Sequence, residues 1–251
     1  MTLPVPPSVA LDRSGTDWLG TFPGLGTVVV SPDGHVEVHP VDDGPTGEKA
    51  AALRHGWGEL LASTRRGHSL ALGAALVSAD ASAGALLVCG TAHEVAPVVL
   101  ALTGVDWTLL SDRPTPTSWE DGRLIAHPRP APFVMAFERA ADSGRSFGTV
   151  RTPSNAVALD VPRAEDPAPI RALLLVQRRR PDEEPFTELS GHRKFERAAS
   201  VMVGGVLASE HASDETAVSE HLRIAELPSA VLRIDGPDAG LLETVRAWWS
   251  R

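Results

Sequence analysis

Apolar runs alternate along the chain with short polar breaks, and their spacing predicts strands and helices in turn. Residues 26–41 (GTVVVSPDGHVEVHPV) place two β-branched runs on either side of a Pro-Asp-Gly turn, which is typical of a β-hairpin. Residues 48–67 have apolar positions at helical spacing. The segments 69–78 (SLALGAALVS) and 84–90 (GALLVCG) are almost continuously apolar, as expected for strands buried on both faces of a sheet.

The second half of the chain continues this alternation. Residues 94–104 predict a short helix that ends at Gly104, and residues 239–251 predict an amphipathic final helix. Adjacent residues of a helix cannot both face inward, so we expect only one of Trp248 and Trp249 in the core. Further strands are predicted over 105–112, 122–132, 171–179 and 230–235, and further helices over 187–209 and 214–227. Strands that alternate with helices indicate an α/β domain.

The pattern also suggests how the chain is divided. Residues 1–15 are Pro-rich and are expected to form a flexible arm. Residues 16–251 are expected to form a single α/β domain. Within it, residues 16–66 are either a small N-terminal subdomain or the opening of the same sheet.

Composition narrows the class of protein. The chain has 251 residues, of which 43% are hydrophobic and 22% charged, which is ordinary for a soluble globular protein. Its formal net charge of -9 opposes binding to nucleic acid or to an anionic membrane. The one cysteine, Cys89, excludes an internal disulfide and a cysteine-based zinc cluster, and it is expected to be a core residue. With no signal peptide or apolar span, a cytoplasmic location is predicted.

Residues 86–102 (LLVCGTAHEVAPVVLAL) have the layout of a phosphate-binding loop, which is a strand, a glycine turn and a helix start. In the pattern G-x-x-x-x-G-K-[S/T] the first glycine is Gly90, but the later glycine, lysine and hydroxyl positions are Val95, Ala96 and Pro97. Val95 crowds the backbone, Ala96 has no charge, and Pro97 has no hydroxyl group. Glu94 would repel a triphosphate. Taken alone, the stretch indicates a buried strand that turns into a helix.

A longer stretch changes this interpretation. Residues 65–133 run RRGHSLALGAALVSADASAGALLVCGTAHEVAPVVLALTGVDWTLLSDRPTPTSWEDGRLIAHPRPAPF. In order and spacing they resemble the HPr kinase/phosphorylase-like P-loop proteins, in particular the shorter members found near peptide-modification genes. The resemblance covers most of residues 16–249. It implies an α/β fold in which a P-loop HPr kinase-like sheet is flanked by helices, with an N-terminal β-hairpin and helix.

The departures from the family pattern concern its catalytic residues. The family histidine falls at Leu72 or Gly73. Of the paired acids after the next strand only Asp112 remains, because Arg113 takes the second place. Arg129, in HPRPAP, matches the family arginine. Phosphoryl transfer depends on the missing groups, so neither ATP nor magnesium is expected as a cofactor and no resident metal is expected.

Three functions remain open. The first is a catalytically degenerate binding or scaffold module for a protein or peptide partner, within a peptide-modification pathway and with homo-oligomers left open. The second is an enzyme with a repurposed pocket that uses His93, Glu94, Asp112 and Arg129 on a small anionic ligand or metal, against the simpler interpretation of a solvated loop pair. The third is a divergent ATP-dependent kinase whose lysine is replaced by an arginine from elsewhere. The expected ligand-binding residues are Gly90, Thr91, His93, Asp112 and Arg129, although His127 and Arg129 could instead anchor their loop.

Overall fold

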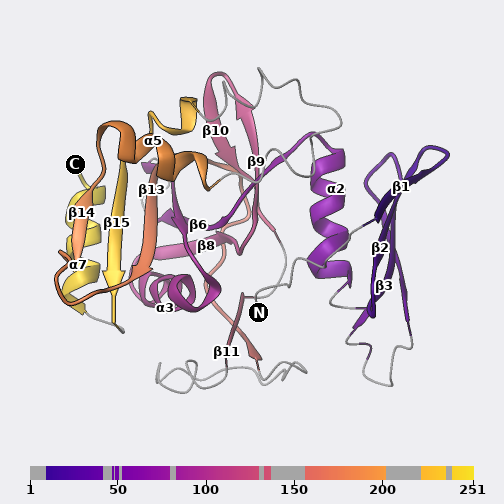
Figure 1. The fold of residues 1–251 in the computed structure, drawn as a ribbon, viewed down its shortest axis with the longest axis horizontal. Coiled ribbons are helices and arrows are strands. Elements are labelled where there is room, and N and C mark those ends of the chain that lie inside the picture. The colour runs from indigo at the N-terminus through magenta and orange to yellow at the C-terminus, as the bar shows by residue number, and fades with distance from the viewer. Residues whose placement is uncertain are drawn as a thin grey trace.

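The computed structural model describes residues 10–41, 47, 49–50, 53–79, 83–129, 133–136, 156–201, 222–235 and 239–251. They form an N-terminal antiparallel sheet and a curled mixed sheet flanked by helices, which lie side by side (Figure 1). The α/β class predicted from the sequence is therefore confirmed. None of the described helices is long and apolar enough to cross a membrane.

The N-terminal sheet has four antiparallel strands in chain order: β1 (Ala10–Ser14), β2 (Asp17–Phe22), β3 (Gly26–Val30) and β4 (Val36–Pro40). The hairpin predicted over residues 26–41 is confirmed as β3 and β4. Residues 10–14 differ from the expected flexible arm, because their backbone pairs with β2 along the whole of β1. The rest of that arm lies outside the described residues.

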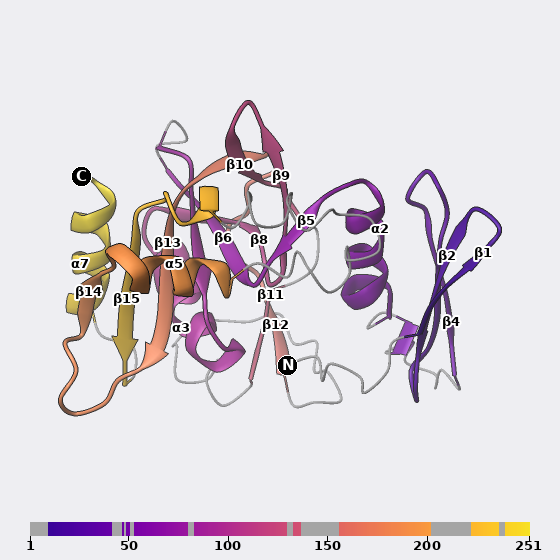
Figure 2. The same ribbon diagram turned by 45° about the horizontal axis from the view of Figure 1, so that its top comes forward.

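A helical segment packs on this sheet. It consists of a wider π-helical stretch, η1 (Leu53–Gly58), followed by α2 (Glu59–Arg65). Its apolar side and the sheet share a core made of Phe22, Val28, Val30, Leu53, Leu61 and Ala62. In both ribbon views α2 lies between the N-terminal sheet and the mixed sheet (Figures 1 and 2). The hairpin thus belongs to a separate sheet and does not open the mixed one.

The mixed sheet, called the main sheet below, contains β5 (Ser69–Ala71), β6 (Gly73–Ser78), β7 (Ala85–Cys89), β8 (Trp107–Ser111), β9 (Thr115–Glu120), β10 (Arg123–Ala126), β13 (Ala168–Arg178), β14 (Phe186–Glu188) and β15 (Ser229–Ile234). The strand order is β5-β9-β10-β13-β7-β6-β8, and β15 pairs with both β13 and β14. The long strand β13 runs parallel to β7 and β15, while β6 runs antiparallel to β7 and β8. A separate pair is formed by β11 (Phe133–Ala136) and β12 (Ala156–Leu159).

The observed elements differ from the predicted ones at several places in the main sheet. The single strand predicted over 69–78 is two strands, because β5 pairs with β9 while β6 pairs with β7. Strand β9 was not predicted, and it joins β10 through Asp121 and Gly122, whose φ angles of 48° and 75° suit a tight hairpin turn. The helix predicted over 187–209 is shorter, since its start belongs to β14 and the described helix is α5 (Gly191–Ala199). Residues 202–221 lie outside the described residues.

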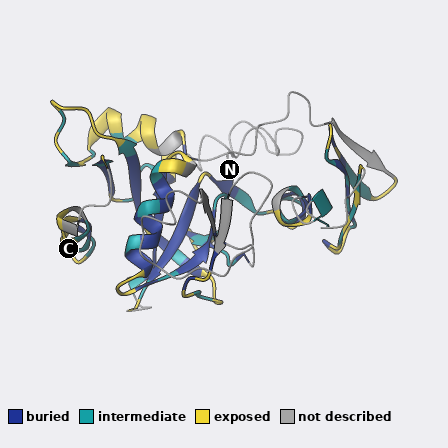
Figure 3. Cartoon of the chain, turned by 90° about the horizontal axis from the view of Figure 1, so that it is seen from below, coloured by how far each residue is buried: buried dark blue, intermediate teal, exposed yellow. Residues whose placement is uncertain are grey.

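Helices cover the main sheet on both faces. On one face α3 (Ala92–Thr103) and α7 (Ala239–Trp249) share a buried cluster with alternate residues of β7, Leu86 and Val88. Leu87 and Cys89 point to the opposite face, where a second buried cluster forms. The strands of the main sheet are largely buried, as predicted for β7 (Figure 3).

Both C-terminal tryptophans contact the core, although only one was expected to. Trp248 is buried, and its ring meets Phe186 edge-on with centroids 5.8 Å apart. Trp249 is partly buried and meets Trp107 edge-on at 5.0 Å. A residue at the margin of a helix face can reach the core when its side chain is as large as an indole.

We expect Phe22→Ala to lower the free energy of unfolding by about 3–5 kcal/mol, because the ring is 1% exposed and stacks on Trp57 at 4.9 Å. The control is Phe195→Ala, whose ring is 38% exposed and whose loss should cost no more than about 0.5 kcal/mol. Urea unfolding followed by circular dichroism measures both. Equal losses in the two variants would contradict the packing described for the N-terminal sheet.

Candidate functional site

The connection between β7 and α3 is too short to be a phosphate-binding loop. Strand β7 ends at Cys89 and α3 begins at Ala92, so only two residues join them. Val95 and Ala96 lie within α3, with 0% and 3% of their surface exposed. The positions that would hold the second glycine and the lysine of a phosphate loop are therefore core positions. The interpretation as a buried strand that turns into a helix is confirmed.

Gly90 has a packing role in this turn. Its φ is +153°, and a Cβ atom added there would lie 2.5 Å from the carbonyl oxygen of Val176 and 3.2 Å from Cγ2 of Val95. The turn thus lies directly on the backbone of β13. Glycine is required by this close approach whether or not a ligand binds.

Glu94 occupies the place at the start of α3 where an anion would bind. Its Oε2 accepts hydrogen bonds from the backbone N–H of Thr91 at 3.0 Å and from the Thr91 hydroxyl at 2.8 Å. Its Oε1 accepts the backbone N–H of Arg178, at the end of β13, at 2.9 Å. The carboxylate closes a capping box and also lies at the positive end of the helix dipole. It therefore joins the turn, the helix and the neighbouring strand.

The structure does not bring His93, Glu94 and Asp112 together. His93 is exposed on α3 and has no hydrogen-bond or ion-pair partner among the described residues. Asp112 follows β8, which is separated from β7 by β6. Two strand spacings are about 10 Å. Glu94 is bonded to β13, on the other side of β7. The carboxylates of Glu94 and Asp112 therefore lie on opposite sides of β7 and do not meet.

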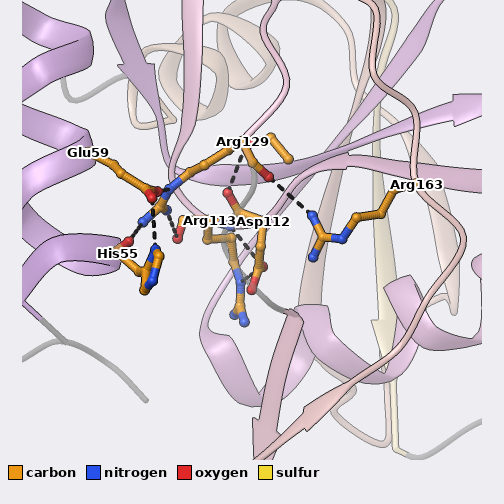
Figure 4. Close-up of polar contacts among 7 residues, drawn as sticks. His55, Glu59, Asp112, Arg113, Arg129 and Arg163 are labelled. Atoms are coloured by element: carbon orange, nitrogen blue, oxygen red, sulfur yellow. Dashed lines mark hydrogen bonds and ion pairs between the residues drawn. The ribbon is translucent and has the colours of Figure 1, made fainter. Parts of the chain in front are cut away.

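Arg129 is committed to internal contacts (Figure 4). Its side chain is 7% exposed, and Nε donates to Oε2 of Glu59 at 3.2 Å while Nη1 donates to the carbonyl oxygen of Arg113 at 3.2 Å. Nη2 donates to the carbonyl oxygen of His55, and the His55 ring lies 2.9 Å from the other oxygen of Glu59. The guanidinium therefore links η1 and α2 to the main sheet, which agrees with an anchoring role.

Asp112 is held between arginines. Its Oδ1 accepts the backbone N–H of Arg113 at 2.8 Å and the Nε of the same residue at 3.3 Å. Arg163 lies on the other side and donates to the carbonyl oxygen of Arg129 at 3.1 Å (Figure 4). Burial lowers the pKa of Arg163, and the charges of Asp112 and Asp160 oppose that effect. Within the described part of the chain, no group of three His, Cys, Asp or Glu side chains is arranged to hold a metal.

A polar cluster that was not predicted lies on β9 and after β10. His68 and His127 stack with ring centroids 4.2 Å apart. Nε2 of His127 lies 2.7 Å from the hydroxyl of Ser118, which donates to Glu120 at 2.8 Å. Burial lowers the pKa of both histidines, which favours the neutral form of their rings. Because β9 was missing from the predicted elements, no sequence signal placed Ser118 beside His127.

Cys89 is a core residue, as expected. Its side chain is 2% exposed, and burial raises the pKa of its thiol far above the usual range. A thiol that stays protonated is a poor nucleophile. Cys89 therefore takes no part in a candidate site.

Searches against protein-family models and against curated proteins find no match for this chain.

We expect Gly90→Ala to lower the free energy of unfolding by roughly 2–4 kcal/mol, since the new Cβ adds a clash to an unfavourable φ. The control is Gly67→Ala, where φ is +84° and no atom lies within 4 Å of the added Cβ, and there the loss should be about 1 kcal/mol. Denaturant unfolding measures both. If Gly90→Ala cost no more than Gly67→Ala, the turn would not rest on β13 as described.

Proposed function

We propose that this protein is a binding or scaffold module with a degenerate HPr kinase-like frame, and that it transfers no phosphate. The strongest support is that the Glu94 carboxylate accepts hydrogen bonds from the backbone N–H groups of Thr91 and Arg178. The pathway, peptide modification, is suggested by the sequence resemblance alone. The net charge of -9 favours a protein or peptide partner over nucleic acid.

The electrostatics of the turn support the loss of nucleotide binding. A phosphate loop presents free backbone N–H groups and a lysine to the phosphates. Here Ala96 takes the lysine position and is buried, and Glu94 contributes negative charge. A phosphate oxygen brought within about 4 Å of this carboxylate would meet a repulsion of about 4 kcal/mol at an effective dielectric constant of about 20. That energy corresponds to roughly a thousandfold loss of affinity.

The alternative of an enzyme with a repurposed pocket has less support. Its candidate residues do not converge, because Glu94 is bonded toward β13 while Asp112 is paired with Arg113 on the far side of β6. General acid–base chemistry needs these groups within hydrogen-bonding reach of one substrate. The stacked histidines near Ser118 line neither of the two pockets described below.

One observation favours the third alternative, a divergent kinase. Arg178 ends β13 beside the Gly90 turn and its side chain is exposed, so it is a candidate among the described arginines to replace the lysine. By contrast, Arg113 and Arg129 have internal acceptors. The variant Arg178→Ala therefore distinguishes this alternative if any nucleotide binds.

We expect millimolar Mg-ATP to leave the melting temperature unchanged relative to magnesium alone, because Glu94 fills the anion position. A nucleotide present at 100 times its Kd would add about 2.7 kcal/mol of stability, so binding would be readily visible. Thermal unfolding with and without nucleotide, followed by titration calorimetry, measures this. Saturable, magnesium-dependent ATP binding would contradict the proposal, and its loss in Arg178→Ala would support the divergent kinase instead.

A further inference from the structure

A second candidate site lies at the opposite edge of the main sheet from Gly90. Gly90 follows the carboxyl end of β7, whereas this pocket is lined by the beginning of β13, which runs parallel to β7. Residues 223–228, just before β15, and the beginning of β10 complete its wall. Its volume is about 470 Å³. The pocket is thus separate from the turn and from the Arg129 contacts.

The pocket has an excess of positive charge. Arg123, Arg171 and Arg223 line it with exposed side chains, and Glu226 is the one acidic residue of its lining. None of the three guanidinium groups has a carboxylate partner among the described residues. Arg223 instead lies over the ring of Trp119, 5.5 Å from the centroid. Three positive charges in one pocket repel one another, and an anion bound between them would offset that repulsion.

Five arginines elsewhere in the described structure have acidic partners, whereas the three arginines of this pocket do not. Ion pairs link arginines to acidic side chains at Arg129–Glu59, Arg113–Asp112, Arg233–Glu183, Arg246–Asp106 and Arg251–Glu188. The formal net charge of -9 means that acidic side chains outnumber basic ones. Unpaired arginines therefore do not result from a shortage of acidic side chains in the sequence.

A second pocket, of about 530 Å³, extends the first. The two share Arg171 and Pro228, and the second continues to Trp248 and Trp249 on α7. We call the two together the arginine groove. Arg171 belongs to both pockets and lies between them. Trp119 lines the first pocket, and Trp248 and Trp249 line the second. This length and these apolar walls exceed what a single small anion requires.

We infer that the arginine groove binds an extended peptide segment that carries closely spaced acidic side chains. The carboxylates meet Arg123, Arg171 and Arg223, and apolar side chains of the same segment pack on the indole rings. The inference rests on the proposed function, because it names the surface and the chemistry of the partner. A long polyanion is disfavoured, because the part of it that extends past the groove would be repelled by the net negative charge of the protein.

The probe for this inference is a fluorescein-labelled acetyl hexapeptide of sequence Glu-Glu-Leu-Glu-Glu-Leu, titrated with the full chain by fluorescence anisotropy. We expect saturable binding that weakens about tenfold or more in Arg171→Glu, because one attractive contact becomes repulsive. Arg123→Glu is the second variant, since the stem of Arg171 also packs near Gly84. Circular dichroism confirms that each variant is folded.

The matched control is Arg54→Glu, which makes the same charge change on the exposed side of η1, beside the N-terminal sheet. It should alter the affinity by less than about twofold. Equal weakening by all three variants would overturn the inference, because the peptide would then respond only to net charge. Absence of saturable binding by the unmodified chain would overturn it as well. So would a preference for inorganic tripolyphosphate, which would identify a phosphate site.

The outcomes also separate this inference from the proposed function. A chain that binds neither the hexapeptide nor Mg-ATP contradicts only the role of the arginine groove. A chain that binds both contradicts only the proposed loss of nucleotide binding.

Discussion

The Glu94 carboxylate is the contact on which the candidate site depends. With one oxygen it holds the backbone N–H and the hydroxyl of Thr91, and with the other it holds the backbone N–H of Arg178. It thereby fixes where α3 begins and ties that helix to β13 across the end of β7. Gly90 can then lie against Val176, and the residues that follow become core residues of α3. An internal carboxylate thus takes the place that a bound phosphate would need.

A buried guanidinium makes the second long-range connection. Arg129 joins η1 and α2 to the main sheet through Glu59 and two backbone carbonyl groups. Together with the pairing of Asp112, this contact neutralises the charges that lie near the ends of β8 and β10. The arginine groove at the opposite edge keeps its three guanidinium groups without acidic partners among the described residues. The charged groups around Asp112 and Arg129 thus have internal partners, whereas the arginine groove is the surface where we propose that a partner binds.

The sequence predicted the elements whose patterns are local. The hairpin of β3 and β4, the buried strand β7 and the helix α3 were all recognised from spacing and turn residues. The break at Leu72 was missed because β5 and β6 differ only in their distant partners. Strand β9 was missed even though Asp121 and Gly122 form a recognisable hairpin turn. Among the site residues, the loss of the phosphate-loop glycine and lysine at Val95 and Ala96 was evident from the sequence. The hydrogen-bond acceptors of Arg129 were not, because Glu59 lies 70 positions away along the chain.

Amide hydrogen exchange measured by NMR tests the role of Glu94 most directly. In the unmodified chain the backbone amides of Thr91 and Arg178 should both exchange slowly, because each donates to the carboxylate. In Glu94→Ala both should exchange rapidly, while the amide of Leu174 in the middle of β13 stays protected as the control. Slow exchange at Thr91 and Arg178 in that variant, or rapid exchange in the unmodified chain, would contradict the account.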